Sequence, residues 1–520
     1  MWRVKPLDQI IATTEKKALK RSLGAVQLTL LGIGAVIGTG IFVLTAAAAQ
    51  KAGPGMMVSF IIAGAVCAVA ALCYAELASM VPVAGSAYTY SYAVLGELVA
   101  WLVGWALILE YALGASAVAV GWSGFITGLF DHWGLHIPHA LTVGPPVHWS
   151  FLSGGEAGGV FNLIAVIITA LVTLLLIVGT RESATVNAVL VAVKVTALTA
   201  FVVLTLPMVF GHLDRFHPFA PRGWGNPLDG SGTGVLGAAA SIFFAYVGFD
   251  AVSTAAEETK NPQRNVPIGL IGSLAICTVF YLLVASGVIG AWGAQPVKDA
   301  AGVFAEGATL QNSAACHVND APTVCSKEAL AYILRKVGYP VVGDALGFAA
   351  AIALPSVVLL MMYGQTRIFF VMARDGLLPR RLSAVHSKFR TPWVITLVTG
   401  AIVALAAAFL PVSQLADYSN AGTLFAFAVV SVGVLVLRVS DPGRRRPFKT
   451  PLIWVVAPLS ILGCIVLFIS LNNESKLLFT GWSILGLVLY FAFGFWNSNV
   501  RRGVVEDVNL EGQGDGQAPA

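Results

Sequence analysis

Charged residues are scarce in this sequence. Asp, Glu, Lys and Arg make up 11% of its 520 residues, against about 25% in typical soluble domains, while 57% of the residues are hydrophobic. This composition excludes a soluble multidomain protein. Apolar runs long enough to cross a bilayer, which takes about 20 residues per helix, recur along nearly the whole chain. They predict an all-α membrane protein that crosses the lipid bilayer many times.

Motifs for catalysis and metal binding are missing as well. The eight histidines all lie outside the apolar runs, so the commonest metal ligand is absent from the predicted spans. The sequence has no C-x-x-C pair, no H-E-x-x-H and no G-x-S-x-G, which leaves redox, metalloprotease and hydrolase functions without support. Basic residues in the connections account for the net charge of +5. We therefore expect no enzyme, no cofactor or metal, and no nucleic-acid partner.

Twelve apolar segments are separated by charged and turn-forming residues. We place the predicted spans near residues 25–50, 57–81, 93–130, 160–179, 184–210, 233–257, 267–293, 341–373, 392–411, 413–438, 452–471 and 477–497. If the N-terminus is cytoplasmic, 21 Lys and Arg residues fall in the inner connections and 8 in the outer ones. Because inner connections are enriched in Lys and Arg, we expect both termini in the cytoplasm and the chain in the cytoplasmic (inner) membrane.

The spans and connections divide the chain into parts. We expect a cytoplasmic N-terminal segment, two groups of five spans, two further spans and a disordered cytoplasmic tail, since the tail is Gly-rich and acidic. The second group contains a long outer connection at 294–340. The corresponding ranges are 1–24, 25–210, 233–438, 452–497 and 503–520.

Three charged residues stand out because they lie toward the middle of predicted spans. They are Glu110, Lys194 and Asp250. A charge at the centre of a span is costly and usually faces a cavity or a partner in the protein. One interpretation is that Glu110 and Lys194 form a structural pair between helices and that Asp250 orients a helix. The other is that Lys194 carries protons, because a desolvated lysine shifts its pKa readily, and that Asp250 lies at a gate or at the substrate.

The first span contains an unusual run of glycines, "LLGIGAVIGTGIF" over residues 30–42. Each glycine costs a helix interior about 1 kcal/mol relative to alanine. A dinucleotide-binding loop is excluded because the run lies in a membrane span rather than after a soluble strand. A G-x-x-x-G pair from Gly34 to Gly38 would let helices pack closely. The third interpretation is a helix broken at mid-membrane, whose freed backbone groups bind a ligand.

A second interruption favours the broken helix. Transporters built from inverted repeats unwind corresponding spans of the two halves. If spans 1–5 and 6–10 are such repeats, span 6 corresponds to span 1, and it carries Gly248 and Asp250 near its middle. The two interruptions therefore predict a pair of broken spans.

Four stretches resemble one known family. They are "GIGAVIGTGIF", "YAELASMVPVAGSAYTY", "FFAYVGFDAVSTAAEETKNPQRNVP" and "YGQTRIFFVMARDGLLP". They are similar to the amino acid–polyamine–organocation superfamily of transporters, most of all to its cationic amino acid transporter branch and the bacterial relatives of that branch. The resemblance runs from about Lys20 to Trp496. It implies a leucine-transporter-type fold of two inverted five-helix repeats with broken spans 1 and 6, plus two extra helices.

The resemblance also implies site residues. Backbone N–H groups of the first break would hold a substrate carboxylate, and on this sequence they belong to Ile37, Gly38, Thr39 and Gly40. Backbone carbonyls of the second break would receive the amino group, and they map to Phe244, Ala245 and Val247. Lys194 matches the lysine of proton-coupled relatives, and Glu110 matches a glutamate of the cationic branch. Pro355 departs from the family pattern near the side-chain pocket.

The expected function is proton-coupled uptake of amino acids by alternating access. An exchanger driven by a product gradient is the nearest alternative, and a nontransporting sensor is the third. Glu110 and Asp250 are candidates for the side-chain pocket or a gate. The expected partners are an amino acid substrate and the lipid bilayer, and a small membrane protein is a further candidate partner. The sequence leaves open whether the substrate is cationic or small and neutral.

Two cysteines lie in the long outer connection, in "CHVNDAPTVC". By the charge count this segment faces the outside, which is oxidising in the bacterial periplasm. We predict a disulfide between Cys316 and Cys325, with two free thiols in a mobile loop as the alternative.

Overall fold

The computed structural model describes the helical body of the chain. Its described residues are 4, 23–80, 86–145, 147–149, 152–154, 158–179, 184–254, 259–299, 301–305, 309–310, 313–318, 320–389 and 391–502. Most of the predicted N-terminal segment and the whole of the predicted tail lie outside these residues. The described part is helical apart from one antiparallel hairpin of two short strands, β1 (Val147–Trp149) and β2 (Leu152–Gly154).

Seven continuous helical stretches are long and apolar enough to cross a membrane. They contain α4 (Leu44–Ala52) with α5 (Met56–Met80), α7 (Glu97–His132), α9 (Ala184–Gly211), α12 (Pro262–Trp292), α15 (Pro340–Arg374), α17 (Val412–Ser440) and α19 (Asn473–Leu489). The last stretch continues through a π-turn into α20 (Phe495–Asn497) and α21 (Asn499–Arg502). The chain is therefore a multi-pass helical membrane protein.

Five shorter apolar helices complete the set. They are α2 (Ala25–Val36), α8 (Leu163–Val178), α10 (Gly234–Ile242), α16 (Trp393–Phe409) and α18 (Ile453–Ile469). Each predicted span coincides with one of these helices or with a group of them. The count of twelve crossings and the inverted repeat stay predictions.

The first predicted span is broken in the middle. α2 ends at Val36, and Ile37 and Gly38 have backbone angles that no helix uses (ψ 93° and ψ −147°). The chain then resumes as α3 (Thr39–Phe42), which leads through Val43 into α4. The glycine run therefore forms an interrupted helix.

The second predicted break has the same character. α10 passes into a 3₁₀ turn (Phe243–Tyr246), and Val247 is extended at ψ 137°. Gly248 follows with φ +109°, in a region that residues with a Cβ rarely adopt. The short helix α11 (Ala251–Thr254) comes after Asp250.

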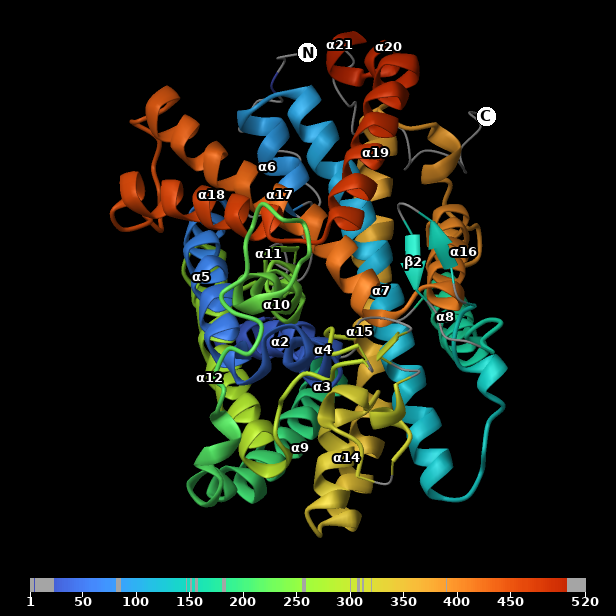
Figure 1. The fold of residues 1–520 in the computed structure, drawn as a ribbon. Helices are drawn as coiled ribbons and strands as arrows, with labels where there is room; N and C mark the ends of the chain where they lie inside the picture. Colours follow the sequence, from blue (N-terminus) through green and yellow to red (C-terminus); the bar gives the residue numbers. More distant parts are fainter. Residues whose placement is uncertain are drawn as a thin grey trace.

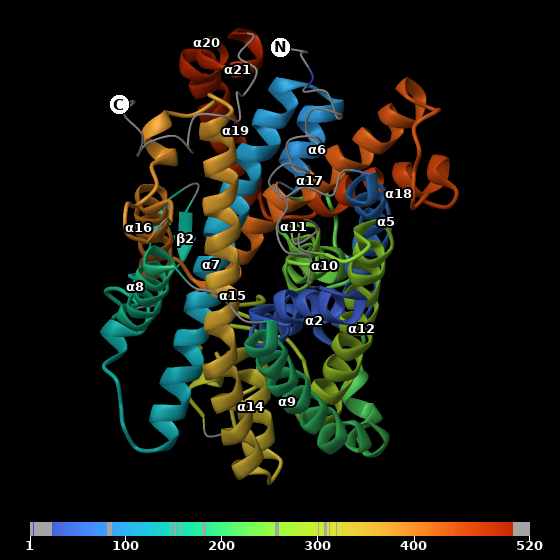
Figure 2. The same cartoon turned by 180° about the vertical axis from the view of Figure 1, so that it is seen from behind.

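α7 lies at the centre of the bundle. It runs beside α15 in both views of the molecule (Figures 1 and 2), and it also packs against α8, α16 and α17. Its most apolar window is 83% buried, as expected for a helix that is hydrophobic on all sides. Helices nearer the periphery expose large apolar side chains instead, such as Val203 of α9 and Leu462 of α18, which suits contact with lipid.

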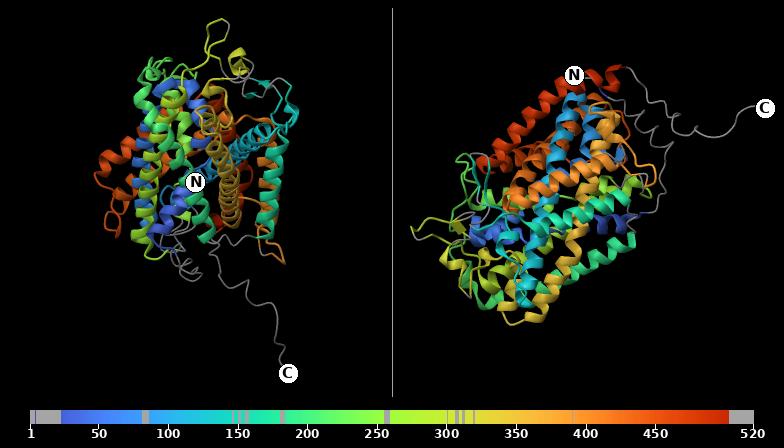
Figure 3. Two further views of the ribbon diagram at one scale, coloured as in Figure 1. Left: turned by 90° about the horizontal axis from the view of Figure 1, so that it is seen from below. Right: turned by 90° about the vertical axis from the view of Figure 1, so that its right-hand side faces the viewer.

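The long polar connections gather at one end. Those after α7, α9 and α12 lie together in the view from below (Figure 3, left). Gln50, near the end of α4, fastens the last of them with hydrogen bonds from its amide to the Val297 and Ala305 carbonyls (3.0 and 2.6 Å). The long connection after α12 is therefore docked on α4, the second half of the first broken helix.

The structure brings Cys316 and Cys325 together. Their sulfur atoms are 1.95 Å apart and their Cα atoms 5.3 Å apart. The 3₁₀ turn that contains Cys325 (Thr323–Cys325) packs against α4, and the Thr323 hydroxyl donates to the Gly293 carbonyl at the end of α12 (2.8 Å). The loop is thus held close to the two helices.

We expect Cys316 and Cys325 to resist alkylation until the protein is reduced. Asp320 lies between them, so cleavage before this aspartate gives two peptides that stay joined only through a disulfide. Mass spectrometry of the unreduced digest should find the joined pair. Recovery of both peptides separately, each alkylated without prior reduction, would show two free thiols.

Candidate functional site

At the first break, a lysine side chain donates a hydrogen bond to a backbone carbonyl that the helix leaves without a partner. A helix end leaves its last carbonyls without N–H partners, and the Gly34 carbonyl of α2 is one of these. The Lys194 ammonium of α9 donates to it at 2.8 Å, and Lys194 is buried at 1% exposure. A cation at the C-terminal end of a helix is favoured by the helix dipole. Lys194 therefore ties α9 to the break.

Tyr281 of α12 lies between the two breaks. Its hydroxyl is 2.9 Å from the Val36 carbonyl at the end of α2 and 2.7 Å from the Ala245 carbonyl of the second break. A hydroxyl has one hydrogen and donates to one carbonyl at a time. The carbonyl that it does not serve remains open to another donor. The apolar pattern of this span did not indicate that Tyr281 contacts both breaks.

The N–H groups after the first break need hydrogen-bond acceptors, whereas the carbonyls before it need donors. The Phe42 N–H reaches back to the Gly38 carbonyl (3.4 Å), and Gly38 has no side chain to cap α3. The preceding N–H groups, of Thr39, Gly40 and Ile41, are those that a helix start leaves without intrahelical partners. The break thus places carbonyls on one side and N–H groups on the other.

The predicted residues of the second break are all buried. Phe244, Ala245 and Val247 are at most 3% exposed. The Phe244 carbonyl already accepts the Val247 N–H (3.2 Å), and the Ala245 carbonyl lies at the Tyr281 hydroxyl. Ala245 is therefore the residue at which the second break meets the first.

Two glycines of the first break differ in their surroundings. A Cβ on Gly40 would lie 2.3 Å from the Ala245 Cα, whereas one on Gly38 would make ordinary contacts with the Val357 side chain at 3.5 Å or more. Gly248 of the second break packs in turn against the Ala35 carbonyl. Gly40 and Gly248 thus allow the two breaks to touch, in addition to releasing backbone groups.

Glu110 lies on α7 away from the first break. α7 meets Thr39 at Gly121, where an added Cβ would be 2.4 Å from Thr39 Cγ2. Glu110 is 11 residues earlier, which is about 16 Å along a helix. Glu110 is buried, its polar neighbours are Asp250 and Thr423, and its carboxylate forms no ion pair with any of the described residues. The interpretation of Glu110 and Lys194 as a pair is therefore wrong.

Asp250 lies beside Glu110. Its Oδ2 accepts a hydrogen bond from the Tyr111 hydroxyl (3.1 Å), and its carboxylate is near enough to Glu110 for the two charges to interact. Tyr111 is the next residue after Glu110 on α7. The structure therefore joins the two gate candidates in one buried acidic cluster on the α11 side of the second break.

A second polar cluster joins α4 and α10, the halves of the two broken helices that lie on the predicted outer side. The Lys51 ammonium of α4 is 2.8 Å from Asp417 Oδ2 of α17, and it also donates to the Ser241 hydroxyl of α10. Ser241 in turn donates to the other Asp417 oxygen. Asn420, one turn further along α17, donates to the Ala240 and Ser241 carbonyls (2.8 and 3.0 Å). We call Lys51, Ser241, Asp417 and Asn420 the outer clamp.

The sequence did contain a signal for the outer clamp. Asp417 is a carboxylate inside an apolar span, the same pattern that marked Glu110 and Asp250. Lys51 was counted only as an outer basic residue. Its partner lies 366 residues away in the chain, so spacing alone does not reveal the pair.

Two touching broken helices, with carbonyls, N–H groups and a buried lysine between them, are features of a membrane carrier for small polar molecules. Comparison with known proteins gives the class directly. Residues 23–493 match the family model described as amino acid permease. The chain belongs to this family, within the amino acid–polyamine–organocation superfamily.

Individual relatives are similar over nearly the full chain. A branched-chain amino acid permease, BcaP, of Bacillus subtilis is 42% identical over 95% of this chain and 97% of its own length. A methylthioribose transporter of the same organism is 40% identical over the same shares. The vacuolar cationic amino acid transporter 4 of Arabidopsis thaliana is 36% identical over 82% of this chain and 64% of its own length. All three are named as carriers rather than enzymes.

We expect Gly40→Ala to destabilise the protein more than Gly38→Ala. The new methyl group at position 40 would overlap the Ala245 backbone, and overpacking of this kind costs about 1–3 kcal/mol. Thermal unfolding in detergent should therefore show a lower melting temperature for Gly40→Ala, with Gly38→Ala near the wild type. Equal melting temperatures for the two variants would mean that the breaks do not touch at Gly40.

Proposed function

We propose that this permease takes up amino acids together with protons by alternating access across the cytoplasmic membrane, with both termini in the cytoplasm. The observation that carries this proposal is the hydrogen bond from the buried Lys194 ammonium to the Gly34 carbonyl. The bond needs the break in the first span, and it is stronger when Lys194 is protonated, because a charged donor forms the stronger hydrogen bond. A change of the break between two conformations would therefore change the affinity of Lys194 for its proton.

An amino acid suits the groups at the breaks. Its carboxylate matches the N–H groups of the first break, which we assign to Gly38, Thr39 and Gly40. The N–H of Ile37, the fourth predicted residue, already donates to the Ile33 carbonyl of α2 (2.8 Å). Its ammonium matches the carbonyls of the second break, which we assign to Phe244, Ala245 and Val247. The proximity of the Tyr281 hydroxyl to both the Val36 and Ala245 carbonyls supports this assignment, because an arriving ammonium takes whichever carbonyl the hydroxyl leaves.

The surroundings of the first break favour a neutral substrate. Val357 faces Gly38, and Met361 and Ser419 lie opposite Gly114 of α7. Glu110 lies about 16 Å along α7 from the contact with Thr39, and Asp417 is already paired with Lys51. Asp250 lies on the α11 side of the second break, where its carboxylate accepts a hydrogen bond from the Tyr111 hydroxyl. A cationic side chain would need a carboxylate at the break to offset its desolvation. We therefore propose neutral aliphatic amino acids, in keeping with the relative named as a branched-chain amino acid permease.

Alternating access requires a barrier on each side of the substrate. The outer clamp joins α4, α10 and α17, so it can open only if the outer halves of both broken helices move away from α17. The acidic cluster of Glu110, Asp250 and Tyr111 lies at the other side of the second break. We assign the outer barrier to the clamp and the inner barrier to this cluster.

An exchanger on the same fold is the second candidate. The relatives include proteins named simply as permeases and as transporters, which does not decide between symport and exchange. Proton movement with one amino acid on one side separates the two. A symporter acidifies the vesicle lumen during leucine uptake, whereas an exchanger moves leucine only when the lumen already contains a substrate.

We expect Lys194→Met to abolish leucine accumulation driven by a proton gradient. Methionine has a similar volume and no proton to give or accept. In proteoliposomes, tracer uptake and a lumenal pH dye should both lose their response, while Lys336→Met, which removes a lysine from the outer connection, should behave as the wild type. Accumulation by Lys194→Met at the wild-type rate would contradict the role of Lys194 in coupling.

We expect Lys51→Met to open the outer barrier. Thr39→Cys places a thiol at the first break, and the free cysteines Cys67, Cys73, Cys277 and Cys464 are all buried. A membrane-impermeant thiol reagent added outside should label the introduced thiol several times faster when Lys51→Met is also present, and the charge-reversed pair Lys51→Asp with Asp417→Lys should restore slow labelling. An unchanged labelling rate after Lys51→Met would show that the outer clamp does not form the outer barrier.

A further inference from the structure

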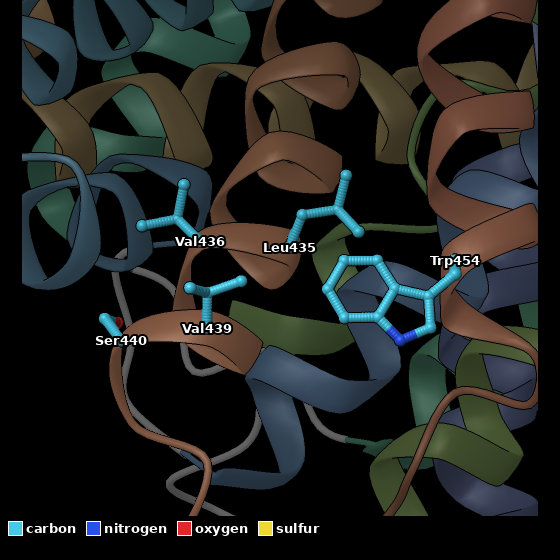
Figure 4. A pocket seen from close by; sticks show the side chains of 5 residues that line it. All are labelled: Leu435, Val436, Val439, Ser440 and Trp454. Carbon is cyan, nitrogen blue, oxygen red and sulfur yellow. The ribbon is translucent and has the colours of Figure 1, made fainter.

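An apolar groove opens between the ends of α17 and α18. It has a volume of about 340 Å³ and is lined by Leu435, Val436, Val439, Ser440 and Trp454. Figure 4 shows the Trp454 ring facing the Leu435 side chain across it. Trp454 and Val439 are 64% and 69% exposed, so the groove faces the surroundings of the bundle rather than its core.

The loop that joins the two helices is rigid and basic. Arg446 is buried within it, and its guanidinium donates to four backbone carbonyls at 2.7–3.2 Å, those of Leu437, Asp441, Pro442 and Arg444. These bonds fold residues 441–450 back over the end of α17. The loop position is therefore set by a buried side chain.

The same loop is fastened to α5. The buried Glu76 carboxylate accepts two hydrogen bonds from Arg438 (2.8 Å each) and one from the Thr450 N–H (2.8 Å). Arg446 lies 3.3 Å from the same carboxylate. Two arginines and a backbone N–H therefore satisfy the Glu76 carboxylate. Its negative charge is neutralised within the protein and does not attract the other cations of the loop.

Two cations of the loop point outward. Arg445 and Lys449 are exposed, and among the described residues neither takes part in an ion pair or hydrogen bond. The indole N–H of Trp454 likewise has no partner there. The acidic residue of the loop, Asp441, is paired with Arg444 (2.8 Å). Arg445 comes five residues after the last groove residue of α17, and Lys449 five before Trp454.

We infer that this groove and loop bind an anionic phospholipid of the inner leaflet. One acyl chain lies in the groove, and the phosphate is held by Arg445 and Lys449, with the Trp454 N–H donating to an ester or phosphate oxygen. Basic residues next to spanning helices on the cytoplasmic side attract anionic headgroups, and tryptophan favours the level of the headgroups. The rigid loop fixes the backbone positions of both cations, so only their side chains need ordering when the lipid binds.

Native mass spectrometry of the full chain with phosphatidylglycerol or phosphatidylcholine tests the inference. Arg445→Gln with Lys449→Gln should weaken phosphatidylglycerol binding about 30-fold, the effect of two basic side chains near an anionic headgroup. Arg381→Gln with Lys388→Gln removes the same charge from another exposed connection on that face, and should leave the affinity within about twofold. Leu435→Trp, which fills the groove and keeps both cations, should also weaken binding.

Three results would overturn the inference. Equal losses in the two double variants would show attraction to net charge alone. Equal affinity for phosphatidylcholine would show that the headgroup charge is not recognised. Unchanged binding in Leu435→Trp, together with competition by inorganic phosphate, would show a phosphate site that does not use the groove.

Discussion

The hydrogen bond between the Lys194 ammonium and the Gly34 carbonyl is the contact on which the centre of the molecule depends. In lipid, every backbone polar group needs a partner within the protein, and a helix that stops at mid-membrane leaves several without one. Lys194, Tyr281 and Asn420 each come from a different helix to serve such a carbonyl. The breaks are therefore stable because three neighbouring helices satisfy them.

This arrangement separates the backbone N–H groups, which carry partial positive charge, from the carbonyls, which carry partial negative charge. At the first break, side-chain donors occupy carbonyls at the end of α2, and the N–H groups of α3 remain. At the second, the Ala245 carbonyl shares the Tyr281 hydroxyl with Val36. Because Gly40 and Gly248 let the breaks touch, the N–H groups and carbonyls stand side by side, as a zwitterion requires. The outer clamp then joins α4 and α10 of the same two helices to α17, so that in the proposed mechanism a movement at the site also moves the barrier.

Much of the fold could be predicted because its causes are local. Long apolar runs identify spans, and the glycines near residues 34–40 and Gly248 mark backbone that leaves the helix. The roles of particular glycines could not be predicted, since Gly40 matters through Ala245, which is 205 residues away. The pairing of Glu110 with Lys194 was wrong for a related reason. Both are charges in spans, but the fold gives Lys194 a carbonyl and places Glu110 beside Asp250. The contacts of Asp417 and Tyr281 could not be predicted, because their partners lie on helices that are distant in the sequence.

Isothermal titration calorimetry of leucine binding, in buffers with different ionisation enthalpies, tests the central claim most directly. If the Lys194 proton and the substrate depend on the same break, the wild-type protein should take up a fraction of a proton per leucine bound when titrations are compared over a series of pH values. Lys194→Met should bind leucine with no proton uptake. Equal proton uptake by the two proteins would contradict the account, because the coupled proton would then reside on another group.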